Sequence, residues 1–255
     1  MKKSILLVGA FALFFICWYY NVFLRWFDTE LLDIKSVRYL LSFLLSGIFP
    51  LIALVLIHKK ADIPESLGLS RGFGLGWGMA ACATLPMFIA FACMGKLNVN
   101  QSADQLVYGI FIAGFFEELF FRGFAFGQLF RYARWGFIPA VLITALPFGA
   151  LHVYQGHDLL SSLVAMGVTA MGGLFFCWLY VEWNYNLWCS IGMHTLMNMS
   201  WILFRVSDNG ATGGLWTNIF RMVTIVTAVL LTVWYKKKYH IPYQVTRATL
   251  WVNRS

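Results

Sequence analysis

Charged residues are scarce in this chain. Only 12% of its 255 residues are Asp, Glu, Lys or Arg, whereas 60% are hydrophobic. A soluble domain carries roughly 25% charged residues, so this composition excludes an ordinary soluble protein. The aromatic share of 18% is typical of a chain that faces lipid and its interfaces. We therefore predict an all-α, polytopic membrane helix bundle that forms a single integral membrane domain over residues 1–255.

Acidic residues are few, and paired cysteines are absent. The chain has 11 Asp and Glu against 19 Lys and Arg, a net charge of +8. Because the basic residues cluster at the ends of apolar runs, membrane topology explains them more simply than nucleic-acid binding, and we expect no nucleic-acid partner. The five cysteines lie inside apolar runs without CxxC spacing, so we interpret them as buried thiols rather than a disulfide framework.

Apolar runs of about 20 residues, the length that crosses a bilayer, predict about eight transmembrane helices. These runs cover residues 4–24, 39–57, 75–94, 107–130, 136–155, 159–181, 185–206 and 215–235. An even number of spans places both ends of the chain on the same side of the membrane. We interpret Lys236-Lys237-Lys238 as a stop-transfer anchor, and Glu182 as an interfacially exposed residue at a segment end.

The distribution of basic residues predicts on which side of the membrane the two chain ends lie. With the N-terminus inside, twelve basic residues fall in inner segments: Lys2, Lys3, Lys59, Lys60, Arg71, Arg131, Arg134, Lys236, Lys237, Lys238, Arg247 and Arg254. Five fall in outer segments: Arg25, Lys35, Arg38, Lys96 and Arg205. This bias predicts both termini in the cytoplasm. The compact chain, without targeting extensions, suggests a multi-pass protein of a bacterial inner membrane.

The fourth predicted span, 107–130, carries three charged residues near its centre: Glu117, Glu118 and Arg122. A charge at the centre of a membrane helix costs about 2.5–3.5 kcal/mol on insertion scales, so such a cluster predicts a functional site. Residues at i and i+4 share a helix face, and we therefore expect Arg122 to hold Glu118 ionised. Glu117 lacks this partner, which makes it the better candidate for a general base.

Two other spans add histidines and an amide. His152 follows Phe148 by four residues, and Asn198 follows His194 by four. Counted from the segment centres, Glu117 and His194 lie near the midplane and His152 lies roughly 9 Å from it, so all three are expected around one cavity. Glu117, with His152 nearby, would deprotonate a water molecule. His194 and Asn198 would then donate hydrogen bonds to the oxyanion that forms when this water attacks a peptide carbonyl.

These motifs resemble those of the CPBP family, the CAAX-protease and bacteriocin-processing intramembrane endopeptidases that include type II CAAX prenyl endopeptidases. The family motifs EExxxR, FxxxH and HxxxN stand here in the family's order at 117–122, 148–152 and 194–198, and the resemblance covers roughly 107–200. It implies a glutamate-dependent protease with a catalytic core at about 107–206. The implied catalytic residues are Glu117, His152, His194 and Asn198, supported by Glu118, Arg122 and Phe148.

Other chemistries remain open at this stage. The sequence contains neither the HExxH of zinc proteases nor the GxGD of aspartyl intramembrane proteases. We therefore expect no cofactor, with zinc at Glu117, His152 and His194 as the alternative. The expected partners are a membrane-associated protein or peptide-precursor substrate and the lipid bilayer, whereas the oligomeric state does not follow from the sequence. The alternative function is a non-catalytic membrane immunity or scaffold protein of a bacteriocin or export system.

Overall fold

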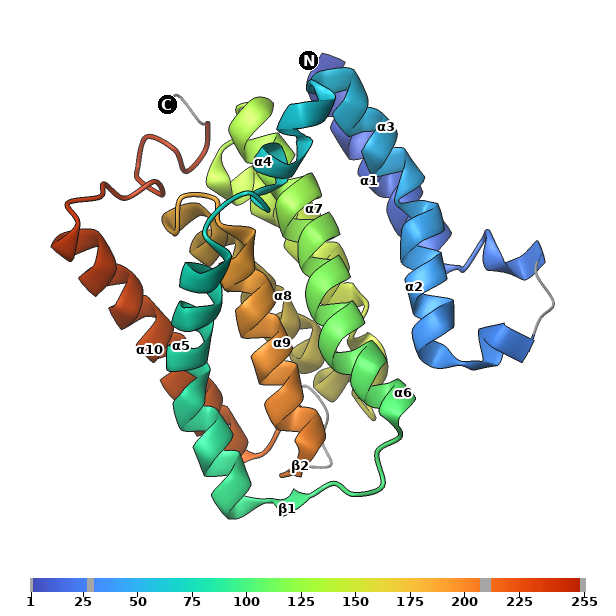
Figure 1. The fold of residues 1–255 in the computed structure, drawn as a ribbon, viewed down its shortest axis with the longest axis vertical. Coiled ribbons are helices and arrows are strands. Elements are labelled where there is room, and N and C mark those ends of the chain that lie inside the picture. Colours follow the sequence, from blue (N-terminus) through green and yellow to red (C-terminus); the bar gives the residue numbers. More distant parts are fainter. Residues whose placement is uncertain (1, 27–29, 207–211, 253–255) are drawn as a thin grey trace.

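The computed structural model describes residues 2–26, 30–206 and 212–252, which form a bundle of long helices (Figure 1). The long helices are α1 (Lys2–Tyr19), α2 (Lys35–Ser46), α3 (Ile48–Ile57), α5 (Phe73–Met94), the π-helix η4 (Val107–Phe126), α7 (Phe137–Ala150), α8 (Leu159–Glu182), α9 (Leu187–Leu203) and α10 (Leu215–Lys238). Each of the predicted spans overlaps at least one of these helices, and the prediction of an all-α membrane bundle is confirmed.

Short elements connect the long helices. The helical turns are η1 (Leu24–Trp26), η2 (Glu30–Asp33), η3 (Lys60–Asp62), α4 (Ile63–Leu67), α6 (Ala103–Leu106), η5 (Gln128–Tyr132) and η6 (Val153–Gln155). Strands β1 (Lys96–Leu97) and β2 (Phe204–Arg205) pair in antiparallel fashion at one end of the bundle. Asp158 begins α8 by accepting the backbone N–H of Ser161 at 2.7 Å, and this hydrogen bonding holds the pKa of the Asp158 carboxyl below its usual value.

Within the part of the chain that the structure describes, six segments are long and apolar enough to cross a membrane by length and composition. They are α1, the α2–α3 segment Lys35–Ile57, α5, the segment Phe137–Gln155 that contains α7, α8 and α10. The other two predicted spans, η4 and α9, are also helical but differ from these six. Helix η4 carries three charged residues, and α9 is only 17 residues long. Both pack against several other helices, and η4 contacts α1, α2, α7, α8 and α9.

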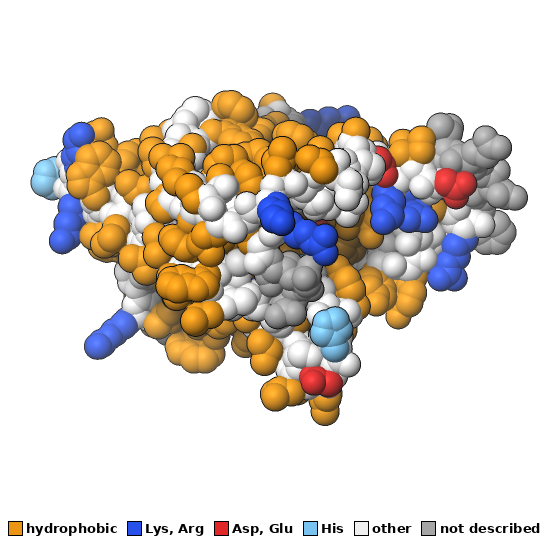
Figure 2. Space-filling view, turned by 90° about the horizontal axis from the view of Figure 1, so that it is seen from below, with side chains coloured by type: hydrophobic (Ala, Val, Ile, Leu, Met, Phe, Trp, Pro, Cys, Tyr) orange, Lys and Arg blue, Asp and Glu red, His pale blue; other side chains and the backbone are white. Residues whose placement is uncertain are grey.

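Hydrophobic side chains cover much of the outer surface. Figure 2, which views the end of the bundle that carries β1 and β2, shows many hydrophobic side chains and few charged ones. Among mid-helix residues, Phe111 is 58% exposed, Met171 64% and Leu230 62%. Water would disfavour so much exposed apolar surface, whereas lipid tails solvate it. The burial pattern therefore agrees with a multi-pass membrane protein.

Both ends of the described chain lie at the same end of the bundle. In Figure 1, α1 begins and α10 ends near the top of the view, opposite β1 and β2. This arrangement agrees with an even number of spans. Arg254, one of the basic residues predicted on the inner side of the membrane, lies outside the described residues.

A buried ion pair ties the C-terminal tail to this end. Lys236 Nζ lies 2.7 Å from Glu182 Oε2, and the two side chains are 1% and 0% exposed. The same carboxylate accepts the backbone N–H groups of Gln244 and Val245 at 3.2 and 2.8 Å. The expectation of interfacial exposure for Glu182 is therefore wrong, and Lys236 is more than an anchor at the lipid surface. Glu182 ends α8 and Lys236 lies near the end of α10, so the two residues are far apart in the sequence. The apolar pattern of neither segment indicates that they meet.

We predict that Glu182→Gln destabilises the protein and releases the tail. Removing one partner of a buried ion pair costs about 3–5 kcal/mol, because the remaining charge loses its counter-ion. Melting in detergent and protease cleavage after α10 would both report the change. Lys237→Met, at an exposed neighbouring position, should alter neither readout, and the double variant Glu182→Gln/Lys236→Met should recover part of the stability. Unchanged melting of Glu182→Gln would contradict this account.

Candidate active site

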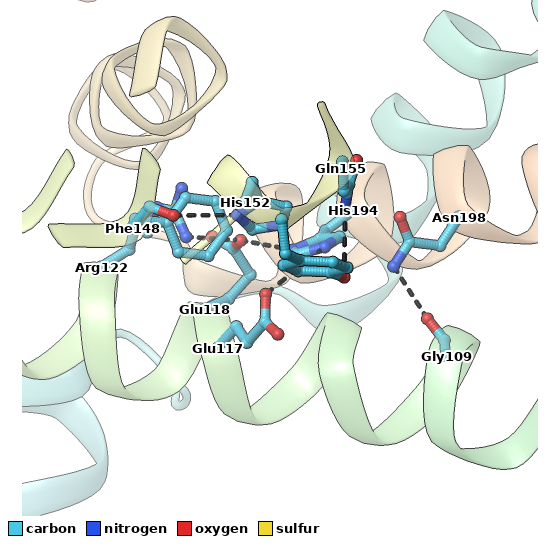
Figure 3. Close-up of polar contacts among 10 residues, drawn as sticks. Gly109, Glu117, Glu118, Arg122, Phe148, His152, Gln155, His194 and Asn198 are labelled. Atoms are coloured by element: carbon cyan, nitrogen blue, oxygen red, sulfur yellow. Dashed lines mark hydrogen bonds and ion pairs between the residues drawn. The ribbon is translucent and has the colours of Figure 1, made fainter. Parts of the chain in front are cut away.

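Glu118 is held by two partners at the centre of the bundle (Figure 3). Its Oε1 accepts a hydrogen bond from Arg122 Nη1 at 3.0 Å and lies 2.7 Å from His194 Nδ1. Glu118 is 0% exposed and Arg122 1%. The predicted pairing of Glu118 with Arg122 is confirmed. The contact with His194, which is 76 positions away in the sequence, was not predicted.

Arg122 also packs between aromatic rings. Its guanidinium carbon lies 4.3 Å from the centroid of the Phe148 ring and 5.4 Å from that of Phe176. Contact with aromatic rings stabilises a guanidinium that is buried away from water. The Phe148 ring also lies 5.2 Å from the His152 ring, measured between centroids. Phe148 therefore contacts both the ion pair and the histidine of its own motif.

Glu117 occupies a different environment from its neighbour. Its Oε2 lies 3.9 Å from His194 Nε2, and its side chain is 17% exposed. Figure 3 shows the Glu117 carboxylate directed toward His194 from the ribbon of η4. Among the described residues, Arg122 forms its ion pair with Glu118 and not with Glu117. His194 thus lies between the two carboxylates, with one ring nitrogen toward each.

His152 and Asn198 are each held by a backbone carbonyl. His152 lies in the turn after α7, and not inside a helix as the predicted span implied. Its Nδ1 lies 2.9 Å from the carbonyl oxygen of Phe148. Because a carbonyl only accepts, Nδ1 carries the proton and Nε2 presents a lone pair. Asn198 Nδ2 donates to the carbonyl of Gly109 at 2.8 Å, a contact that joins α9 to the first turn of η4.

A cavity of about 560 Å³ connects several of these residues. His152, His194 and Asn198 line it, together with Arg221 from α10. Glu117 is not part of this lining, but it contacts His194 as described above. The sequence did not indicate Arg221 as a cavity residue, because it belongs to no motif and lies near the start of the last predicted span. The volume falls within the range of about 300–1,000 Å³ typical of small-molecule sites.

Close contact between η4 and α9 positions the carboxylates against His194. A Cβ added at Gly114 would lie 3.1 Å from the Cα of Thr195 and closer still to its hydroxyl oxygen. Thr195 directly follows His194 in α9. Only a glycine leaves room for this approach, as at small-residue contacts between membrane helices.

A serine-hydrolase spacing also occurs in the chain, away from this cluster. Residues 68–72 read Gly-Leu-Ser-Arg-Gly, which satisfies the GxSxG pattern. Ser70 is exposed in the connection between α4 and α5, outside the strand-to-helix turn that the motif requires. The pattern therefore does not indicate a nucleophilic serine.

The described side chains do not form an evident metal site. In the ranges that the structure covers, no group of three or more His, Cys, Asp or Glu residues is arranged to hold a metal ion. This includes Glu117, His152 and His194, the zinc ligands considered from the sequence.

Comparison with known families agrees with the motifs. Residues 100–200 match the family model described as type II CAAX prenyl endopeptidase Rce1-like. The matched segment contains all three motifs and runs from the residues before α6 to near the end of α9. The resemblance stated from the sequence is confirmed, and the match supports a peptidase. No curated protein and no solved structure matches the chain.

We predict that Gly114→Ala lowers peptidase activity by separating η4 from α9. The added methyl group meets the backbone of Thr195, so the Glu118–His194 hydrogen bond should lengthen. Gly167→Ala is a matched control, because a Cβ at that position in α8 has open space around it. Hydrolysis rate and melting temperature in detergent should both fall for the first variant and stay unchanged for the second. Equal behaviour of the two would show that the contact does not matter.

Proposed function

We propose that this chain, whose residues 100–200 match the Rce1-like family model, cleaves membrane-associated proteins or peptide precursors with an intramembrane glutamate as general base. One observation carries the proposal. Glu118 is bound to Arg122 and His194, while the adjacent Glu117 is close to His194 but outside the Arg122 pair. The two neighbouring carboxylates therefore have different contacts, and we assign them different roles in catalysis.

In the proposed mechanism, Glu117 takes a proton from a water molecule that attacks the peptide carbonyl. His152 assists, because its Nε2 lone pair lines the cavity and accepts a hydrogen bond or proton. A base placed in this way contributes roughly 10²–10⁴-fold to the rate. The proton then passes to the leaving amine. No covalent intermediate forms, and no metal is needed to generate the nucleophile.

His194 is suited to stabilise the oxyanion. Ionised Glu118 only accepts hydrogen bonds, so His194 Nδ1 carries a proton in this contact. When Nε2 is protonated as well, the ring becomes a cation whose charge Glu118 stabilises. The two carboxylates then balance the charges of Arg122 and His194. Asn198 retains a second amide N–H besides the one bound to Gly109, and we propose that it donates to the same oxyanion.

We also propose which substrates the protein cleaves and which end of the bundle faces the cytoplasm. The family description names CAAX prenyl endopeptidases, whose substrates carry a prenylated cysteine followed by three residues. A leader or bacteriocin precursor is the substrate expected in bacteria. The excess of basic residues at the end that holds both termini supports a cytoplasmic location for that end.

We predict that Glu117→Gln abolishes hydrolysis without loss of stability. The assay uses purified protein and two internally quenched peptides, one with farnesylcysteine followed by three apolar residues and one unprenylated leader sequence. The variant should lose roughly 10²-fold or more in kcat and keep the wild-type melting temperature. Glu118→Gln should instead lower the melting temperature, because the buried Arg122 charge loses its partner. Full hydrolytic activity of Glu117→Gln would refute Glu117 as the general base, whereas hydrolysis of neither peptide by the wild type would favour a non-catalytic immunity or scaffold role.

We also predict that phenanthroline leaves hydrolysis unchanged. The proposed nucleophile is a water activated by Glu117, so removing free zinc should have no effect on the initial rate. A non-chelating phenanthroline isomer controls for binding of the inhibitor to the apolar cavity. Complete inhibition by the chelator alone, reversed by added Zn²⁺, would establish a zinc mechanism instead.

A further inference from the structure

A second cavity lies at the far end of α10, away from the candidate active site. It has a volume of about 340 Å³ and is lined by Lys236 and Lys237 at the end of the helix and by residues 240–243 in the turn that follows. Lys236 stands fifteen residues after Arg221, so the α10 residues that line the two cavities are roughly 22 Å apart along the helix axis. None of the described residues that line this second cavity is acidic, and three of them are basic.

The turn after α10 forms the wall of this cavity. His240 has a φ of 54°, in the left-handed region, and the backbone N–H of Ile241 donates to the carbonyl of Lys236 at 2.9 Å. The chain reverses here, and the tail runs back toward the bundle (Figure 1). Lys236 Nζ donates to the carbonyl of Pro242 at 2.7 Å, which holds the turn against the helix. Hydrogen-bonded backbone, and not only surface side chains, therefore shapes the cavity.

The polar groups that face the cavity are hydrogen-bond donors. The charge of Lys236 is balanced by Glu182, whose buried carboxylate also accepts two backbone N–H groups. An ammonium group has three N–H donors, so Lys236 keeps one besides those directed to Glu182 and Pro242. Lys237 and His240 are exposed at the rim and add an ammonium group and an imidazole. Donors of this kind suit an anion with several acceptor oxygens, such as a phosphate group.

Aromatic side chains place the cavity at the level of the lipid headgroups. Helix α10 is one of the six segments that are long and apolar enough to cross a membrane, and the cavity lies at its end. Trp234 and Tyr239 are 56% and 54% exposed there, and Lys238 Nζ lies 4.8 Å from the centroid of the Trp234 ring. Exposed Trp and Tyr side chains collect at the interface between membrane and water. The phosphate groups that surround a cavity at this level belong to lipids.

We propose that this cavity binds the headgroup of an anionic phospholipid. Lys237 and His240 bind the phosphate, and the remaining N–H of Lys236 donates to the same group. The acyl chains lie along the exposed apolar face of α10, on which Leu230 and Trp234 are exposed. A zwitterionic headgroup binds less well, because its own cation meets the charge of Lys237. The cytoplasmic leaflet, which the proposed topology assigns to this end of the bundle, is the one that carries anionic lipids.

The test measures lipid binding by native mass spectrometry of delipidated protein in detergent. Dioleoyl phosphatidylglycerol should bind as one molecule per chain, at concentrations where dioleoyl phosphatidylcholine does not bind. Lys237→Gln should weaken the binding of phosphatidylglycerol roughly tenfold, because a charged hydrogen-bond donor is lost. Adding His240→Asn, which tolerates the left-handed backbone, should weaken it further. Lys238→Gln is the matched control, because it removes the same charge from an exposed residue outside the lining and should change the affinity less than about twofold.

Three results would overturn the lipid site. The first is equal binding of the two lipids. The second is an equal loss in Lys237→Gln and Lys238→Gln, which would indicate general attraction to a basic surface. The third is displacement of phosphatidylglycerol by inorganic phosphate at a similar concentration, which would indicate a site for a soluble anion. Glu117→Gln protein should bind phosphatidylglycerol like the wild type, so failure of the proposed peptidase mechanism would leave this inference standing.

Discussion

The buried contact of Glu118 with Arg122 and His194 is the interaction on which the site depends. Burying a carboxylate without partners would cost free energy. The Arg122 guanidinium and the His194 imidazole together stabilise the ionised form of Glu118. The same contact fixes the orientation of His194, because one ring nitrogen faces Glu118 and the other faces Glu117. In the proposed mechanism, Glu118 is therefore a positioning residue. The same proposal gives Glu117, which lies outside the Arg122 ion pair, the role of general base.

The surrounding helices serve this arrangement in identifiable ways. Gly114 lets η4 approach α9 closely enough for the Glu118–His194 contact, and the aromatic rings of Phe148 and Phe176 cover the guanidinium of Arg122. Helices η4 and α9 are less like ordinary lipid-facing spans than the other six segments, because one is charged and the other is short. Both helices carry candidate site residues, and both pack against several other helices.

Local features could be predicted from the sequence, and contacts through space could not. Helix spacing alone indicated the Glu118–Arg122 pair, and three short motifs indicated which segments would supply the site. The position of His152 in a turn depends on where α7 ends, and Pro147 does not mark that end, because the helix continues to Ala150. The contact of Asn198 with Gly109 joins segments 89 positions apart, and no local pattern reports such a pairing. Arg221 could not be predicted as a cavity residue for the same reason, because only the packing of α10 places it in the cavity wall.

The most direct test of the account is an experimental structure with a phosphinic peptide, whose tetrahedral phosphorus imitates the hydrated peptide carbonyl. If Glu117 activates the attacking water, one phosphinate oxygen lies at hydrogen-bond distance, about 2.6–3.2 Å, from the Glu117 carboxylate. The other oxygen should face His194 and Asn198, while Glu118 keeps its contacts with Arg122 and His194. A phosphinate oxygen bound to Glu118, with Glu117 turned away, would contradict the division of work between the two glutamates.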